Sequence, residues 1–503
     1  ATDATYSLSE PVDINNNLLV SDGTFDLAVN TNDITVGGDW TIDLVGGGGF
    51  THSNADVTFD GTDQDIEAGT FYNFITSGGG TKQLQSNIDV DNDMSIGALT
   101  TLDAQEYNIY VGDDWTNNGS FTQSGLGTVL FDGTQTQNID NGAVATDFNH
   151  LVFLNGGAKF FRNSSNVNAD FIINGGSGYV DVGTYTITGV GGSNTFANNA
   201  TLFVRGTNNF PSGFETINLA SNSWVDYLGI IDQTIYETTY GNLRIRSMGA
   251  TTTKTAAGDL IIAGQLDMDN DALTTLDMNA NSADMTITGN ITSQADNIIW
   301  GTGTTTITHN GGNWNIDPDL ATFNNMVFSG TANKWMYGDL TVTGDVTVQN
   351  GVYLRMYRNN DRSQPHTMTG LGTKTFTLEN GSRCYCPIAD GTGPAIPDNF
   401  GTYSLSDNSY YYLFSPDGVN QTLYTGNSIS YGNLYFYGVK NVTSDGIATL
   451  DINGNFDMNT ATYIDNGQNI NFAGAYAYFT NYSPSAPTVT VNLDGAINQR
   501  ISD

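Results

Sequence analysis

Short runs that alternate strictly between apolar and polar residues recur along this chain. The clearest are residues 260–268, 285–291, 340–348 and 450–458, and each has a glycine near its middle. Because successive side chains of a strand point to opposite faces, a period of two predicts strands with one buried face. The central glycine suits a bend between two strands, since glycine tolerates positive φ. Apolar residues seldom recur at helical spacing, so we expect no amphipathic helix.

Longer phrases repeat as well. In one phrase an aromatic segment contains an asparagine and is followed by a lysine, and five of the six lysines occupy this place. The five copies contain Asn73 and Lys82, Asn149 and Lys159, Asn242 and Lys254, Asn325 and Lys334, and Asn433 and Lys440. A second phrase, usually Gln-x-Ile, begins at Gln64, Gln137, Gln233, Trp314, Gln421 and Gln499. Such repetition predicts one structural unit copied along an axis.

The alternating runs return about every 20 to 25 residues, as expected for single turns of a β-solenoid. We therefore predict an all-β fold, an elongated parallel β-helix of roughly 20 coils that runs continuously over residues 1–503. Superrepeats are expected at about 1–70, 71–147, 148–239, 240–322, 323–430 and 431–503, the first and last partial. The alternative is a tandem array of immunoglobulin-like β-sandwiches, because superrepeats of this length would suit such domains.

The composition of the chain limits the kinds of partner that it can bind. The chain has 52 acidic and 15 basic residues, a formal net charge of −37. Such a field repels phosphates and anionic lipid, so nucleic acid and bare membrane are poor partners. No stretch of about 18 apolar residues occurs, so we expect no segment that spans a membrane. The two cysteines, Cys384 and Cys386, align with Leu202 and Val204 of another superrepeat, so both thiols are expected to face the core.

The repeated lysines allow two interpretations. They could form a row of cations on one face that holds an anionic glycan or a neighbouring filament. Alternatively, each lysine lies over a strand and pairs with an acidic or carbonyl group at a bend. We favour the second, because one cation per superrepeat offsets the stacked negative charge of so acidic a chain.

Two acidic clusters are weak candidates for calcium, the one cofactor that the sequence allows. They comprise Asp89, Asp91 and Asp93, and Asp267, Asp269 and Asp271. Alternate residues of a strand share a face, and carboxylate oxygens are the ligands that calcium prefers. However, the glycine and the distal glutamate of an EF-hand are missing, so solvated acidic faces remain the alternative.

We expect no enzyme. The four histidines are His52, His150, His309 and His366, and none of them pairs with a repeated serine or cysteine. Carboxylate pairs carry little weight in a chain with 52 acids, because some pair will show any spacing.

The alternative function is a β-helix that binds or cleaves glycans, since this fold alone does not exclude chemistry. It predicts a groove with clustered aromatic side chains beside arginine or lysine. The run of Tyr410, Tyr411 and Tyr412 is the candidate for such a cluster.

Several phrases together resemble a known family. Residues 113–121, 127–133 and 137–139, followed by 148–151, are similar to the repeats of very large secreted surface proteins of Bacteroidetes. Residues 210–243 resemble them too. The resemblance implies export through the type IX route and a role as adhesin, matrix fibre or gliding filament. It implies an extracellular location, at the cell surface or in the biofilm matrix, and it transfers no catalytic residue.

The chain starts and stops at nearly the same phase of its repeat. We therefore expect either an excerpt of a longer array or head-to-tail self-association. The sequence as a whole predicts a segment of an extracellular filament, stalk or adhesin, with surface glycans or other cells as further partners.

Overall fold

The structure is a computed structural model. It describes residues 4–27, 32–154, 156–176, 178–268, 273–292, 297–308, 314–316, 322–358, 361–387, 396–414, 420–437, 441–446, 448–459, 461–478, 482–483, 490–493 and 500–502. Their regular structure consists of strands, from β1 (Thr5–Ser7) to β68 (Arg500–Ser502), and none of these residues lies in an α-helix. Parallel strands stack into a β-solenoid of about 20 turns, which confirms the predicted fold class.

A turn of the solenoid contains three short strands where the pattern is most regular. One such turn consists of β10 (Gly69–Phe71), β11 (Asn73–Thr76) and β12 (Gly80–Leu84). These strands pair in parallel with β13 (Ile88–Val90), β14 (Met94–Ile96) and β15 (Thr100–Asp103) of the next turn. Three sheets therefore enclose the interior here.

Parallel pairing decides between the two predicted architectures. Antiparallel pairing occurs between β50 (Tyr357–Arg358) and β51 (Asp361–Pro365), which form a local hairpin, whereas the pairings that stack one regular turn on the next are parallel. Immunoglobulin-like sandwiches are built from antiparallel sheets, so that alternative is wrong.

The alternating runs became strands as predicted. Residues 260–268 form β36 (Leu260–Ile262) and β37 (Leu266–Met268), with the glycine-containing bend between them. Residues 340–348 form β47 (Leu340–Val342) and β48 (Val346–Val348) in the same way. In each strand the first and third side chains are buried, because they face the interior.

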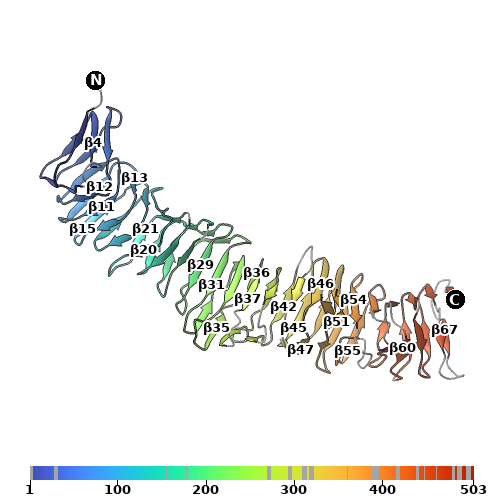
Figure 1. The fold of residues 1–503 in the computed structure, drawn as a ribbon. Coiled ribbons are helices and arrows are strands. Elements are labelled where there is room, and N and C mark those ends of the chain that lie inside the picture. The colour runs from blue at the N-terminus through green and yellow to red at the C-terminus, as the bar shows by residue number, and fades with distance from the viewer. Residues whose placement is uncertain are drawn as a thin grey trace. The chain divides into compact units, whose positions relative to one another are not determined.

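The chain divides into two compact units. Unit 1 comprises Ala1–Ile235 with Thr239–Asn242, and unit 2 comprises Tyr236–Thr238 with Leu243–Asp503. Successive strands lie side by side within each unit (Figure 1). One sheet of unit 1 contains β20 (Gln137–Asp140), β23 (Ala158–Phe161), β26 (Tyr179–Asp181), β29 (Thr201–Val204) and β31 (Trp224–Tyr227). A sheet of unit 2 contains β46 (Ala332–Met336), β49 (Val352–Arg355), β54 (Arg383–Pro387), β56 (Tyr410–Phe414) and β59 (Asn433–Tyr437).

Aromatic rings fill much of the interior. In unit 1 the buried rings of Phe71 and Phe74 meet edge to face, with centroids 5.2 Å apart. Trp115 packs against Phe148 at 5.5 Å. Such pairs add about 0.5–1.5 kcal/mol each beyond the free energy of burial. The first pair lies within one turn, whereas the second joins neighbouring turns.

Candidate functional site

The repeated lysines point into the solenoid. Lys82, Lys159, Lys254 and Lys334 are between 0% and 2% exposed. Each shares its strand face with the buried residue two positions later, as Lys82 does with Leu84. These four side chains therefore cannot present a row of cations on the outer surface, and Lys440 lies outside the described residues.

Backbone carbonyls at bends accept hydrogen bonds from these lysines. Lys159 Nζ donates to Gly133 O at 2.5 Å. Lys82 Nζ donates to Gly79 O at 2.6 Å and also to Gly61 O. Burial disfavours the charged form of lysine, and it lowers the pKa of Lys159 and of Lys334 to about 8.

The glutamine of the second phrase lies beside the lysine in the stack. Gln64 pairs in register with Lys82, and its Nε2 donates to Val36 O at 2.8 Å and to Gly38 O at 2.5 Å. Its Oε1 accepts from Gly61 N at 2.9 Å. Because these partners belong to bends of different turns, the side chain ties successive turns together from the inside.

The same arrangement returns in other copies. Gln137 pairs in register with Lys159, and its Nε2 donates to Val111 O and Asp113 O at 2.9 Å and 2.6 Å. The fifth copy differs, since Gln421 lies opposite Val442.

The repeat asparagines sit at bends where one strand gives way to the next. Asn73 opens β11; its Nδ2 donates to Asp56 Oδ1 at 2.7 Å, and its Oδ1 accepts from Asp93 N at 3.0 Å. One side chain thus contacts the turns on both sides. In three other copies the asparagine Nδ2 donates to a backbone carbonyl: Asn149 to Gly125 O, Asn242 to Ser223 O, and Asn433 to Ser409 O. In the remaining copy Asn325 Oδ1 accepts from Asp345 N.

The calcium candidates do not converge among the described residues. Those residues contain no group of three or more His, Cys, Asp or Glu side chains arranged to hold a metal ion. Asp91 lies 3.1 Å from His52 Nε2, whereas Asp93 accepts a hydrogen bond from Asp114 N. Burial and the neighbouring Asp91 raise the pKa of Asp89.

The second calcium cluster is described only in part. Asp267 Oδ2 accepts a hydrogen bond from Arg244 Nε at 2.8 Å, so an arginine already neutralises this carboxylate. Asp269 and Asp271 lie outside the described residues.

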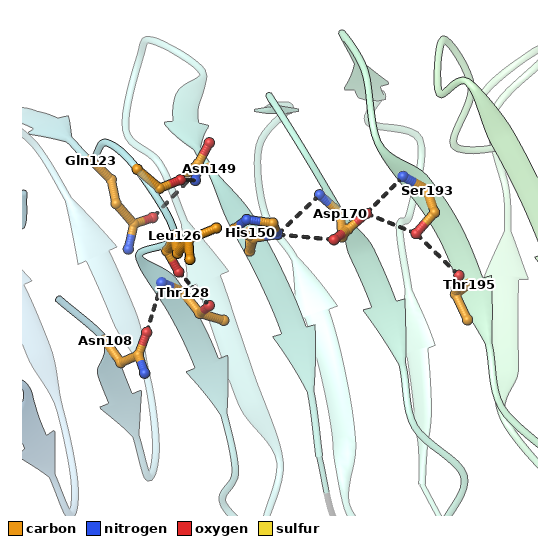
Figure 2. A network of polar contacts seen from close by, with 10 residues as sticks. Asn108, Gln123, Leu126, Thr128, Asn149, His150, Asp170, Ser193 and Thr195 are labelled. Atoms are coloured by element: carbon orange, nitrogen blue, oxygen red, sulfur yellow. Dashed lines mark hydrogen bonds and ion pairs between the residues drawn. The ribbon is translucent and has the colours of Figure 1, made fainter. Parts of the chain in front are cut away.

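A histidine, an aspartate and a serine meet on the outer surface of unit 1 (Figure 2). Asp170 lies between the other two, with Oδ2 3.1 Å from His150 Nδ1 and Oδ1 2.8 Å from Ser193 Oγ. A serine nucleophile needs the histidine beside its hydroxyl, with the carboxylate behind the histidine. Here the carboxylate occupies the middle place, so the three residues cannot act as that triad. Burial opposes ionisation of Asp170, but the bonds from Ser193 and the nearby His150 outweigh it and lower the pKa.

Both cysteines face the core, as predicted. Cys384 and Cys386 are free thiols and are 0% and 2% exposed. Tyr411, which lies between the half-buried Tyr410 and Tyr412, is also buried, and its hydroxyl donates to Cys386 Sγ at 3.0 Å. The expectation that Tyr411 joins a surface cluster was therefore wrong, because alternation along β56 turns it inward.

A ladder of stacked side chains covers the outside of the sheet in unit 2. We call Trp335, Arg355, Tyr385 and Tyr412 the outer column of unit 2. They stand in register on the neighbouring strands β46, β49, β54 and β56. The guanidinium carbon of Arg355 lies 4.8 Å from the Trp335 ring and 4.2 Å from the Tyr385 ring. Tyr385 and Tyr412 stack at 4.4 Å, and burial raises the pKa of Tyr412 to about 12.

A second arginine stands beside this column. Arg383 lies between the rings of Tyr353 and Tyr410, at 4.6 Å and 5.0 Å. Neither Arg355 nor Arg383 forms an ion pair with a carboxylate of any residue that the structure describes. Both guanidinium groups are thus held by aromatic rings and keep their positive charge uncompensated at short range.

The corresponding position of unit 1 carries acidic residues. Lys159 and Lys334 mark the same place in the repeat, and Phe160 and Trp335 follow them. The outer column of unit 1 is Phe160, Asp181, Phe203 and Asp226, in register on successive strands. Arg205 covers Asp181, with Nη2 and Oδ2 2.7 Å apart.

The outer column of unit 2 can offer hydrogen-bond donors and positive charge to a ligand, and it is the best candidate for a binding site. The sequence pointed to Tyr410 and Tyr412 beside an arginine, and both lie there. It missed Arg355, Arg383 and Tyr385, whose approach depends on which strands stack.

Comparisons of the chain with protein-family models, with curated proteins and with solved structures gave no match. The described residues contain no helix that is long and apolar enough to cross a membrane. Any function must therefore be argued from the stack and its surfaces.

Proposed function

We propose that this chain is a segment of an extracellular structural protein, a surface filament, stalk or adhesin. The observation that carries the proposal is the internal fastening of turn to turn by the repeated phrases. Gln64, for example, bonds to carbonyls of an earlier turn while Lys82 of the next turn stacks on it. Repetition of fastening residues, with no repeated reactive group, suits a mechanical role.

The stack gives such a protein both length and resistance. Each turn adds about 4.8 Å in the stacking direction, the distance between paired strands. Bending the stack would separate backbone hydrogen bonds and aromatic contacts such as Trp115 with Phe148. The asparagines at the bends add side-chain bonds to turns on both sides, as Asn73 does.

The resemblance to secreted Bacteroidetes surface proteins supports the same proposal. It adds export through the type IX route and a place at the cell surface or in the biofilm matrix. A net charge of −37 would keep such β-rich chains apart in solution, because like charges repel. Head-to-tail self-association or continuation in a longer chain would then extend the filament.

Imaging tests this proposal. The secreted protein, purified from its native surface, should be seen in frozen-hydrated images as extended bodies. A compact globule would refute the stalk and filament roles. Removal of the fastening residues supplies the control: a Gln64→Leu and Gln137→Leu double variant should lose stability without losing any binding to glycans.

The alternative role, a β-helix that acts on glycans, divides into binding and cleavage. Binding is favoured by one specific observation, the outer column of unit 2 with Arg383 beside it. Cleavage receives no support from His150, Asp170 and Ser193, whose order leaves the serine hydroxyl bonded to a carboxylate. An oligosaccharide-degradation screen separates the two, since release of fragments would favour cleavage.

A further inference from the structure

The geometry points to the outer column of unit 2, together with Arg383, as a binding surface for an acidic polysaccharide. This inference deepens the proposed adhesin role by naming its ligand class. It rests on the charge, order and spacing of the side chains on the outer face of β46 to β56.

The charge around Arg355 and Arg383 differs from that around Arg205 and Arg244. In a chain with 52 acidic residues, arginines are expected to meet carboxylates, and Arg205 and Arg244 do so at 2.7 Å and 2.8 Å. Arg355 and Arg383 instead lie between aromatic rings, with no carboxylate of a described residue in ion-pairing distance. A guanidinium held in this way offers its charge and its N–H edge to an external anion.

Several hydrogen-bond donors of Arg355 remain without a partner among the described residues. Arg355 Nε donates to Asn333 Oδ1 at 2.7 Å, and its Nη1 donates to Tyr357 Oη at 2.6 Å. A guanidinium has five N–H donors, so several are left over. The stacked rings of Tyr385 and Tyr412 cover each other's faces, and the Tyr385 hydroxyl bonds to Arg383, which leaves the ring edges and the Tyr412 hydroxyl for hydrogen bonding. The surface therefore suits a ligand with acid groups and hydroxyls rather than one that needs a bare ring face.

The spacing of the outward side chains also bears on the ligand. Arg355, Tyr385 and Tyr412 follow one another on successive turns, so this part of the column presents one polar group per turn, at intervals of about 4.8 Å. An extended polysaccharide repeats its hydroxyls and acids at a similar interval, one sugar at a time. An extended acidic peptide repeats same-face side chains about every 6.6 Å, which does not match. Nucleic acid carries about one charge per 1.7 Å of duplex, and the chain's net charge of −37 repels so dense a polyanion.

Unit 1 supplies the contrast. At the equivalent places its outer column has Asp181 for Arg355 and Asp226 for Tyr412. Asp226 is 1% exposed and Asp181 is paired with Arg205, so this column offers no uncompensated cation to an anion. The inference therefore assigns binding to unit 2 alone.

The test measures retention of the full chain in gels that contain polygalacturonate, dextran sulfate, neutral dextran or polyglutamate. We expect retention by one or both acidic polysaccharides at about 0.1 M salt, where the Debye length is about 10 Å. Arg355→Gln and Arg383→Gln should each weaken it about tenfold, since each removes a charge-assisted contact. Arg162→Gln is the matched control: its guanidinium lies 5.1 Å from the Phe160 ring in unit 1, and its loss should change retention less than twofold.

A second pair of variants guards against misfolding. Arg355→Lys and Arg383→Lys keep the positive charge but lose the planar set of N–H donors of the guanidinium. These variants should therefore bind less well than the original chain but better than the glutamine variants. Equal retention by polyglutamate or by neutral dextran would overturn the inference, as would equal loss in the Arg162→Gln control. Absence of retention on every matrix would also overturn it, while images of extended bodies would leave the structural proposal intact.

Discussion

The two outer columns begin at the same place in the repeat and differ in chemistry. Unit 1 alternates rings with carboxylates, and an arginine from a bend neutralises Asp181. Unit 2 replaces those carboxylates with Arg355 and Tyr412, and rings hold the guanidinium. The interior is alike at this position, since Lys159 is buried in unit 1 and Lys334 is buried in unit 2. In this fold the inward positions maintain the stack, while the outward positions are free to specialise.

The largest expected effect is on the free energy of unfolding, and it appears when Arg205 of unit 1 is compared with Arg383 of unit 2. Arg205→Met would leave Asp181 without its partner, and that side chain is only 4% exposed. We expect the free energy of unfolding of unit 1 to fall by about 2–4 kcal/mol, because an unpaired buried carboxylate remains. Arg383→Met in unit 2 leaves no carboxylate behind and should cost about 1 kcal/mol, the value of its ring contacts. Hydrogen exchange resolved by unit measures both, and equal losses would contradict the contrast.

The buried lysines test whether the interiors are alike. Burial lowers the pKa of Lys159 and of Lys334 to about 8 in the folded protein, against 10.5 when unperturbed, so the folded state releases these protons first. Stability should therefore rise with pH between about 8 and 10.5, and the protonated lysine should destabilise the fold below that window. Lys159→Met and Lys334→Met should each remove on the order of 1–3 kcal/mol of this rise. Urea unfolding at pH 7 and pH 10 measures it; a rise of unchanged size in either variant would contradict the assignment.

The next effect concerns the stability contribution of Asp170, a carboxylate of unit 1 that lies outside the outer column. Its folded pKa is lowered, so its contribution is present above the unfolded value of about 3.9 and disappears as pH falls through the folded value. Asp170→Asn should cost about 1 kcal/mol at pH 7, from weakened bonds to Ser193 and His150. Unfolding curves of the variant and the original chain should approach each other below pH 4. A constant difference at all pH values would show that charge plays no part.

The smallest effect concerns the tyrosines of unit 2. Tyr412→Phe keeps the stacking with Tyr385 and removes one hydroxyl, so stability should change by less than about 0.5 kcal/mol. Burial raises the pKa of Tyr412 to about 12. In an ultraviolet titration, the Tyr412→Phe variant should therefore lack one phenol that ionises near pH 12 in the original chain. Loss of a phenol that ionises near pH 10 instead would place Tyr412 in an open setting.

The sequence predicted the fold well because its signals are local. The alternation in residues 260–268 and 340–348 fixed strands and bends in advance, and repetition of phrases indicated stacking. The inward direction of the lysines was not predicted, although a signal existed: Lys159 stands two residues before the apolar Phe161 and so shares its face.

The outer column of unit 2 could not be predicted in full. Tyr410 and Tyr412 are close in sequence and were singled out, but the contact of Arg355 with Tyr385 spans the hairpin of β50 and β51. Turn length varies along the chain, so spacing alone does not reveal which side chains share a register. The first calcium cluster shows the same limit, because proximity in sequence did not place Asp93 beside Asp91 in one site.

Within each unit, turns stacked in register present one outward column of side chains. The most direct measurement is a frozen-hydrated reconstruction of the native surface protein at a resolution that separates strands. We predict rungs about 4.8 Å apart, with Trp335, Arg355, Tyr385 and Tyr412 on consecutive rungs of one face. Separate globular lobes without a common rung spacing would contradict this arrangement.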